Sequence, residues 1–156
     1  MKSGKLVIAA FIILFAFLVS SSVVLAALEK GTKKEAEALV KKAIAYSKVN
    51  GKDKTLAEIN KPGGPFDKGD LYVFAYDVTA TIVAHPKNPK LIGKNLMNIP
   101  DNSGTYFRKE IVEIAKSKGS GWVDYKYANP ETRKLESKTT YLQKFGDLIL
   151  CCGAYK

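Results

Sequence analysis

The sequence predicts an α+β fold in which helices pack against an antiparallel sheet. Residues 32–50 carry apolar side chains at helical spacing, whereas residues 71–155 contain segments rich in aromatic and β-branched residues, separated by short turns. A chain of 156 residues has room for one domain with a hydrophobic core and little else. We therefore expect a single α+β domain.

The first predicted element is an amphipathic helix over residues 32–50. Lysines and glutamates fill one face, and the apolar positions of the other face are Ala36, Leu39, Val40, Ala43 and Tyr46. Thr32 and Glu35 have the spacing of a capping box, and Gly51 is expected to end the helix. A second, short helix is expected over residues 55–60.

A β-hairpin is predicted next. Residues 71–78 and 81–85 have strand composition and are joined by a two-residue turn at Thr79 and Ala80. The loop that follows, residues 86–104, is long for a small domain, and loops of that length tend to be functional.

The C-terminal half predicts one helix and three strands. An apolar stripe indicates a helix that ends at Gly119, and its residues are Phe107, Ile111, Ile114 and Ala115. The strands are expected over residues 122–127, 137–145 and 148–155. A hairpin loop and a tight turn connect them, so they form an antiparallel meander.

The N-terminus has the three parts of a secretory signal. Two lysines, at positions 2 and 5, precede an uninterrupted apolar run over residues 6–19, and small residues follow up to Ala26 and Ala27. Cleavage is expected after one of these two alanines. The sequence does not choose between them.

We therefore divide the chain into a signal peptide, residues 1–26, and one domain, residues 27–156. The competing interpretation is an uncleaved anchor, because the apolar stretch up to Leu28 is long enough to cross a hydrocarbon core at ~1.5 Å per residue. Both interpretations export the domain to the periplasm or the cell exterior, because the N-terminal lysines favour the cytoplasmic side.

Composition argues against several classes of function. The formal net charge is +10, but the lysines are scattered among acidic residues with no arginine-rich tract, so nucleic-acid binding is not expected. His85 is the single histidine, and no cluster has metal-ligand spacing, so no metal site is expected. No cofactor is expected either, because haem-attachment and phosphate-binding motifs are absent from the sequence.

An enzymatic activity is not expected. Ser120, His85 and Asp77 could be assembled into a catalytic triad, but no nucleophile elbow or other local signature supports it. The hypothesis of an exported hydrolase would require an activity that His85→Ala abolishes.

The two cysteines, Cys151 and Cys152, are adjacent and cannot join distant segments of the chain. We expect them to be two small apolar strand residues. Because neighbouring strand residues point to opposite faces, an exposed one could still form an intermolecular disulfide in an oxidising compartment. A homodimer is therefore an alternative that the sequence leaves undecided.

Aromatic and cationic side chains on the predicted strands are the remaining candidates for binding. They are Tyr72, Phe74, Trp122, Tyr125, Lys138 and Tyr141. An aromatic pocket excludes water, tyrosine hydroxyls orient a ligand, and a buried cation strengthens a carboxylate contact, so this set suits a small organic anion. The alternative is that the aromatics are core residues and the lysine extends to solvent.

An ordered set of motifs spans most of the expected mature chain. It comprises Leu71–Asp77, Ala84–Pro86, Leu91–Leu96, Asp101–Gly104, Gly119–Trp122, Tyr125 with Asn129 and Pro130, Lys138, Tyr141 and Gly153–Tyr155. In order and spacing this set resembles the single Cache domain family of the second type. The resemblance implies a PAS-like antiparallel sheet with a long N-terminal helix, an extracytoplasmic location, and a pocket over the sheet for small organic molecules, frequently short carboxylates.

The resemblance also implies ligand-binding residues. The candidates at matching positions are Tyr72, Phe74, His85, Trp122, Tyr125, Lys138 and Tyr141. His85 could donate to a carboxylate when protonated, or it could order its loop through a backbone hydrogen bond. Lys94, Asp101 and Gly104 are expected to shape the loop rather than to bind.

These observations lead to the hypothesis of an exported sensor domain for a short organic anion such as a small carboxylate. The sequence ends at Lys156 without a kinase or a second membrane span. A separate membrane receptor or kinase is therefore the expected signalling partner. The alternative is an exported structural or interaction module with no exchangeable ligand.

Overall fold

The structure is a computed structural model that describes residues 30–156. The signal peptide or anchor predicted over residues 1–26 lies outside the described residues. Within residues 30–156, no helix combines the length and the apolar character that a membrane span requires.

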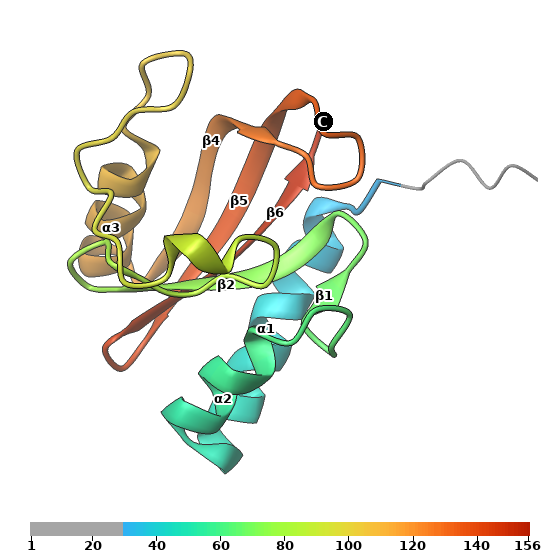
Figure 1. The fold of residues 1–156 in the computed structure, drawn as a ribbon. Helices are drawn as coiled ribbons and strands as arrows, with labels where there is room; N and C mark the ends of the chain where they lie inside the picture. The colour runs from blue at the N-terminus through green and yellow to red at the C-terminus, as the bar shows by residue number, and fades with distance from the viewer. Residues whose placement is uncertain (1–29) are drawn as a thin grey trace, which may run out of the picture.

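Six strands form one antiparallel sheet in the order β1-β2-β6-β5-β4, with β3 paired to β2 (Figure 1). Their bounds are Asp67–Lys68 for β1, Leu71–Asp77 for β2, Ile82–Ala84 for β3, Ser120–Ala128 for β4, Leu135–Phe145 for β5 and Leu148–Tyr155 for β6. The predicted hairpin and meander are both present. β6 joins them, because it pairs with β2 on one side and with β5 on the other.

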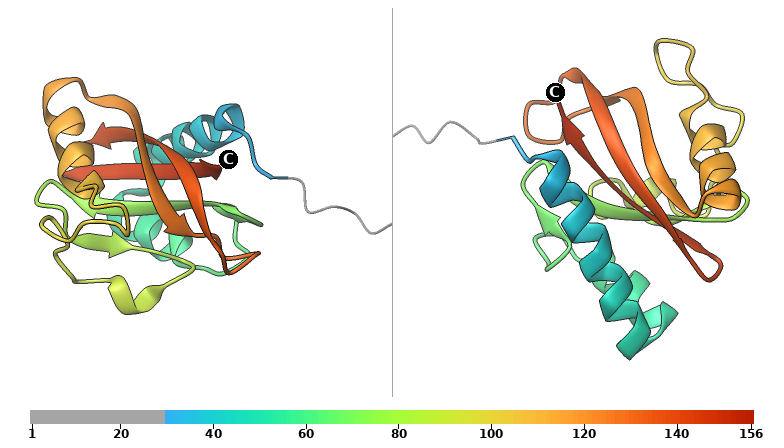
Figure 2. Two further views of the ribbon diagram at one scale, coloured as in Figure 1. Left: turned by 90° about the horizontal axis from the view of Figure 1, so that it is seen from above. Right: turned by 180° about the vertical axis from the view of Figure 1, so that it is seen from behind.

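Helices cover both faces of this sheet. The helices are α1 (Lys33–Asn50), α2 (Lys52–Ile59), α3 (Phe107–Ser117) and a 3-10 turn η1 (Pro89–Leu91). Figure 2 shows α1 running across one face, whereas α3 lies on the other side of the sheet, beside β4. This is the predicted α+β, PAS-like arrangement.

The N-terminal helix is positioned by the predicted capping box. The backbone N–H of Glu35 donates to the Thr32 hydroxyl at 3.2 Å, and the Thr32 N–H donates to the Glu35 carboxylate at 2.8 Å. Gly51, at φ 81°, ends α1, and α2 follows directly from Lys52 rather than from residue 55. The apolar face of α1 packs on β2, β5 and β6.

The sheet carries a separate core on each face because strand side chains alternate in direction. On the α1 face the strands contribute Val73, Ala75, Tyr141, Leu150, Cys152 and Ala154. On the α3 face they contribute Tyr72, Phe74, Tyr76, Val123, Tyr125, Leu142, Ile149 and Cys151. The face to which a strand residue points therefore decides whether it can reach a site under α3.

Cys151 and Cys152 lie on opposite faces of β6, as expected, but both are completely buried. The expectation that one of them could be exposed is therefore wrong. The reason is that β6 lies inside the sheet and both of its faces are covered. Burial raises the pKa of the Cys152 thiol to about 12 and that of Cys151 well above its usual range.

The β2–β3 turn is built without glycine. Ala80 adopts φ 66°, a conformation that glycine accepts more easily. The Asp77 carboxylate accepts hydrogen bonds from the backbone N–H groups of Thr79 and Thr81 at 2.8 and 2.9 Å. These bonds hold the turn in place of the missing glycine.

Candidate functional site

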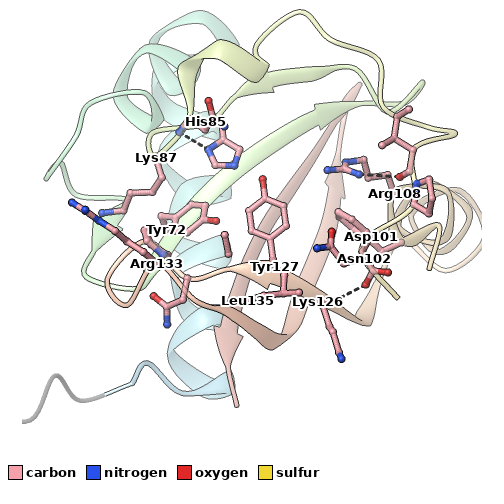
Figure 3. Close-up of a pocket in the computed structure, with 17 residues that line it drawn as sticks. Tyr72, His85, Lys87, Asp101, Asn102, Arg108, Lys126, Tyr127, Arg133 and Leu135 are labelled. Atoms are coloured by element: carbon pink, nitrogen blue, oxygen red, sulfur yellow. Dashed lines mark hydrogen bonds between the residues drawn. The ribbon is translucent and has the colours of Figure 1, made fainter. Parts of the chain in front are cut away.

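A cavity of about 520 Å³ opens on the α3 side of the sheet (Figure 3). Four segments line it: β2, the loop after β3, the segment that leads into α3, and the end of β4 with its following loop. Its lining includes the side chains of Tyr72, His85, Lys87, Asp101, Arg108 and Tyr127. Its volume is in the range typical of small-molecule sites.

Lys138 lies beneath the floor of this cavity, in the middle of β5, and is only 1% exposed. Its ammonium donates to the hydroxyl oxygens of Tyr72 and Tyr155, at 3.0 and 3.3 Å. The ammonium is 4.1 Å from the ring centre of Tyr72 and 4.5 Å from that of Tyr155, with the rings of Phe74 and Tyr127 farther out. Lys138 thus fills an aromatic cage, and Tyr72 separates it from the cavity.

Gly153 on β6 makes room for this lysine. A Cβ atom at position 153 would lie 2.3 Å from Cε of Lys138 and 2.3 Å from Oγ1 of Thr140. Atoms do not approach so closely, so only glycine leaves space for the lysine stem at this point of the sheet.

The charge of Lys138 is not balanced by an ion pair, although the buried carboxylate of Asp70 lies close enough to oppose part of the effect of burial on the lysine pKa. No acidic side chain of residues 30–156 forms an ion pair with it. Burial lowers the pKa of Lys138 from its ordinary value of 10.5 to about 7. A buried cation of this kind is stabilised when an anion comes close to it.

His85 faces the cavity from the loop after β3 and is 4% exposed. Its Nδ1 accepts a hydrogen bond from the backbone N–H of Asn88 at 3.0 Å, which orders the loop. Burial, followed by the positive charge of Lys138, lowers the pKa of His85 to about 4. The ring is therefore neutral near pH 7, and because Nδ1 is an acceptor, the proton is on Nε2.

Arg108, in the first turn of α3, was not among the predicted site residues. Its side chain points toward the cavity in Figure 3, and the residue is 7% exposed. Nη1 donates to the carbonyl oxygen of Ile99 at 3.1 Å, and the guanidinium lies 4.1 Å from the ring centre of Phe107. Nε has no hydrogen-bond partner within residues 30–156.

Asp101 is the single carboxylate among the residues that line the cavity. One of its oxygens accepts from the backbone N–H groups of Ser103 and Thr105, both at 2.8 Å, and the other accepts from that of Lys126 at 2.7 Å. Burial alone would raise the pKa of Asp101, but these hydrogen bonds outweigh it and lower the pKa to about 2. Asp101 therefore shapes the loop, as expected, and does not neutralise Arg108.

The match to a family model identifies the domain. A model described as a Cache domain matches residues 27–155, which is most of the chain. The chain belongs to the Cache domain family. The resemblance indicated by the motifs is thereby confirmed.

Solved structures of chemosensory proteins share the fold of this Cache domain. A methyl-accepting chemotaxis protein from Vibrio parahaemolyticus superimposes with a TM-score of 0.70 at 22% identity, over 79% of this chain and 87% of that chain. A Cache chemosensory domain, described with the structural basis of its carboxylic acid recognition, gives a TM-score of 0.61 at 28% identity, over 78% and 86% of the two chains.

A curated chemotaxis protein is similar to part of this chain. The methyl-accepting chemotaxis protein McpP of Pseudomonas putida is 33% identical over 76 residues, which is 49% of this chain. The match spans 14% of the length of McpP. The relatives of this Cache domain are thus sensor domains and receptors of chemotaxis.

The structure brings four of the seven predicted site residues to the cavity or directly beneath it. Tyr72 and His85 line it, and Lys138 lies under Tyr72. Phe74 stacks against His85 with ring centres 5.7 Å apart. These four residues form one connected group in the Cache domain.

The other three predicted residues lie elsewhere. Tyr125 stacks on Phe107 at 3.8 Å and bonds the Thr140 hydroxyl at 2.9 Å, so it belongs to the core under α3. Trp122 and Tyr141 pack together, 5.2 Å between ring centres, on the α1 face of the sheet. Strand alternation directs these two side chains away from the cavity, and the site proposed below does not include them.

Proposed function

We propose that this Cache domain is an extracytoplasmic sensor that binds a small organic anion, with a carboxylate as the first candidate. The observation that supports this most strongly is the polarity of the cavity. Tyr72, His85 and Arg108 present hydrogen-bond donors around it, whereas its one carboxylate is already occupied by backbone N–H groups. A donor-lined, apolar-walled cavity is complementary to a carboxylate.

Three donors carry this argument. The oxygen of the Tyr72 hydroxyl accepts from Lys138, and the Tyr72 hydrogen, which the neighbouring Tyr155 hydroxyl also accepts, can turn to a ligand. Neutral His85 offers Nε2–H, and Arg108 offers Nε–H. The sequence alone indicates a donating His85 only in its protonated form, but the neutral ring donates as well through its Nε2–H.

Lys138 is a positioning residue in this proposal rather than a direct ligand. Its ammonium contacts the cavity only through Tyr72, so it orients and polarises the hydroxyl that meets the anion. It also contributes positive potential, since charges interact strongly where water is excluded.

The comparisons support a carboxylate in particular. The neighbour with 28% identity is described in terms of carboxylic acid recognition. We carry this to the present chain as a proposal, because the cavity donors described above are the groups that such a ligand needs.

Isothermal titration calorimetry of the full-length protein in mild detergent tests the proposal, with acetate, propionate and lactate as probes. At least one probe is expected to bind, and Tyr72→Phe is expected to weaken it by about tenfold, the usual loss for a hydrogen bond to a charged group. Tyr106→Phe is the matched control, because Tyr106 is 50% exposed and lies outside this cavity. If the folded protein binds none of the small anions, the proposal is refuted.

Residues 1–26 are proposed to direct export or to anchor the domain. Signalling is proposed to pass through a separate membrane receptor or kinase. The support is that relatives of this domain are chemotaxis receptors. N-terminal sequencing of the exported protein tests the leader: a start at residue 27 or 28 indicates cleavage, and an intact N-terminus indicates an anchor.

A second candidate function is an interaction module with no exchangeable ligand. The observation that favours it is the aromatic cage, which the chain fills with its own Lys138. The same titrations separate the two candidates, because a module of this kind would be folded but would bind none of the anions.

A further inference from the structure

We propose that the preferred ligand is a two-ended dianion, a short dicarboxylate, and that Arg108 determines this preference by holding the second carboxylate. This inference rests on the proposed anion-binding function. It follows from two buried cations that stand at different places around one cavity, each without a carboxylate partner among residues 30–156.

The first end of the site is the pair of donors formed by Tyr72 and His85. The centres of their rings are 5.3 Å apart, and the ammonium of Lys138 donates to the Tyr72 hydroxyl from the side away from the cavity. An oxyanion at this end would meet two neutral donors backed by one ammonium. That arrangement suits a single carboxylate.

The second end is the guanidinium of Arg108, which reaches the cavity from a different element. Figure 3 shows Tyr127 between Arg108 and the His85 side of the cavity. Nη1 of the guanidinium donates to the carbonyl oxygen of Ile99, the Tyr76 hydroxyl lies close to the group, and the buried Nε is unpartnered. Arginine presents a planar fork that binds a carboxylate with two hydrogen bonds, so this end suits a carboxylate as well.

The charges around the cavity leave both ends uncompensated, and the exposed side chains of Lys126 and Arg133 at its edge add further positive charge. Lys87 also lines the cavity, but it pairs with the buried Asp67 at 2.8 Å, and Asp101 is committed to backbone N–H groups. A monocarboxylate can neutralise one end and would leave the other cation buried and unpaired. Since an unpaired buried charge is costly, a ligand with a carboxylate for each end gains the larger stabilisation.

The size of the cavity agrees with a ligand longer than acetate. A volume of about 520 Å³ exceeds the space that a single carboxylate group fills. A compact dianion such as sulfate carries two charges but would reach only one end. Length and charge together therefore define the ligand class.

Calorimetric titration of the full-length protein compares acids with equal carbon number. The dicarboxylates are malonate, succinate and glutarate, the matched monocarboxylates are propionate, butyrate and valerate, and sulfate is the compact dianion. At least one dicarboxylate is expected to bind about tenfold or more tightly than its monocarboxylate counterpart and than sulfate.

Two variants assign this preference to Arg108. Arg108→Gln is expected to reduce dicarboxylate affinity to the monocarboxylate level while leaving monocarboxylate affinity within about threefold, and Arg108→Lys to retain part of the preference. Lys109→Gln is the control, since it removes the same charge from an exposed neighbour on α3.

The outcomes separate this inference from the function on which it rests. Monocarboxylate binding as tight as dicarboxylate binding, or an equal loss of both in Arg108→Gln, would overturn the inference and leave the anion-binding function standing. Absence of binding for every acid would overturn both. If Arg108→Gln fails to fold, the wild-type comparison still tests the dicarboxylate preference, and Arg108→Lys tests the role of Arg108.

Discussion

The ammonium of Lys138 lies 3.0 Å from the hydroxyl oxygen of Tyr72 and 4.1 Å from the centre of its ring. Through this contact a fully buried cation lies one side chain away from a cavity that opens to solvent. In the proposed function, the Tyr72 hydroxyl is therefore the point at which the charge of the protein interior would meet a bound anion.

Replacing the lysine by an apolar residue of similar length separates stability from binding. Lys138→Met is expected to leave the domain as stable or to stabilise it by about 1–4 kcal/mol, because it removes a buried charge without a carboxylate partner. Anion affinity is expected to fall by about tenfold or more, because Tyr72 loses the group that orients it. Thermal unfolding and calorimetry measure the two effects.

The control for that experiment is Lys144→Met, which changes an exposed lysine on the same strand. It should alter neither quantity. A destabilised Lys138→Met protein with unchanged anion affinity would mean that the lysine is structural.

The stability of the domain is expected to rise with pH through the titration of Lys138. Its pKa is about 7 in the folded protein and 10.5 ordinarily, so between these values the unfolded chain binds more protons. The free energy of unfolding is therefore lowest below pH 7 and increases toward pH 10.5. Chemical denaturation at a series of pH values measures this slope, which Lys138→Met should remove.

Anion affinity is expected to change with pH in the opposite direction. A bound anion favours the charged form of Lys138, so affinity is highest below about pH 7 and falls as the lysine loses its proton. Titration of the preferred anion between about pH 6 and 9 checks this. A flat profile in the wild-type protein would show that Lys138 does not titrate in this range.

His85 predicts a second, acidic window. Its folded pKa of about 4 lies below the ordinary 6.5, so the unfolded chain takes up the proton first and stability falls as pH drops through this range. His85→Phe keeps an aromatic ring but is expected to remove this component and to weaken anion binding. Because the chain has one histidine, a decline that persists in the variant must come from other groups.

Gly153 should be intolerant of a side chain. Gly153→Ala is expected to cost about 1–3 kcal/mol, because its Cβ would overlap Lys138 and Thr140. Part of this loss should be recovered when Lys138 is replaced by alanine in the same protein. Independent, additive effects in the double-mutant cycle would contradict the contact.

Local patterns predict most of the fold. The capping box at Thr32 and Glu35 marks the start of α1, and Gly51 marks its end, because helix termini depend on nearby residues alone. β1 was not predicted, since Asp67 and Lys68 are too few to show a period.

The site was predictable only in part. Lys138 and Tyr141 are three positions apart on one strand, so alternation already separates their faces, whereas the resemblance by itself grouped them together. Arg108 could not be identified, because an arginine beside an apolar stripe usually lies in solvent. Its burial depends on how the segment before α3 folds over it, through the carbonyl of Ile99.

The placement of Cys151 and Cys152 inside β6 links the redox chemistry of the chain to its folding. While the sheet is intact, oxidants cannot reach either sulfur, and the raised pKa values keep both as unreactive thiols. Unfolding would release two adjacent thiols together, ready to cross-link to other molecules in an oxidising compartment. Folded molecules would thus remain free of intermolecular disulfides. A molecule that unfolds once can be cross-linked by such disulfides and then fail to refold.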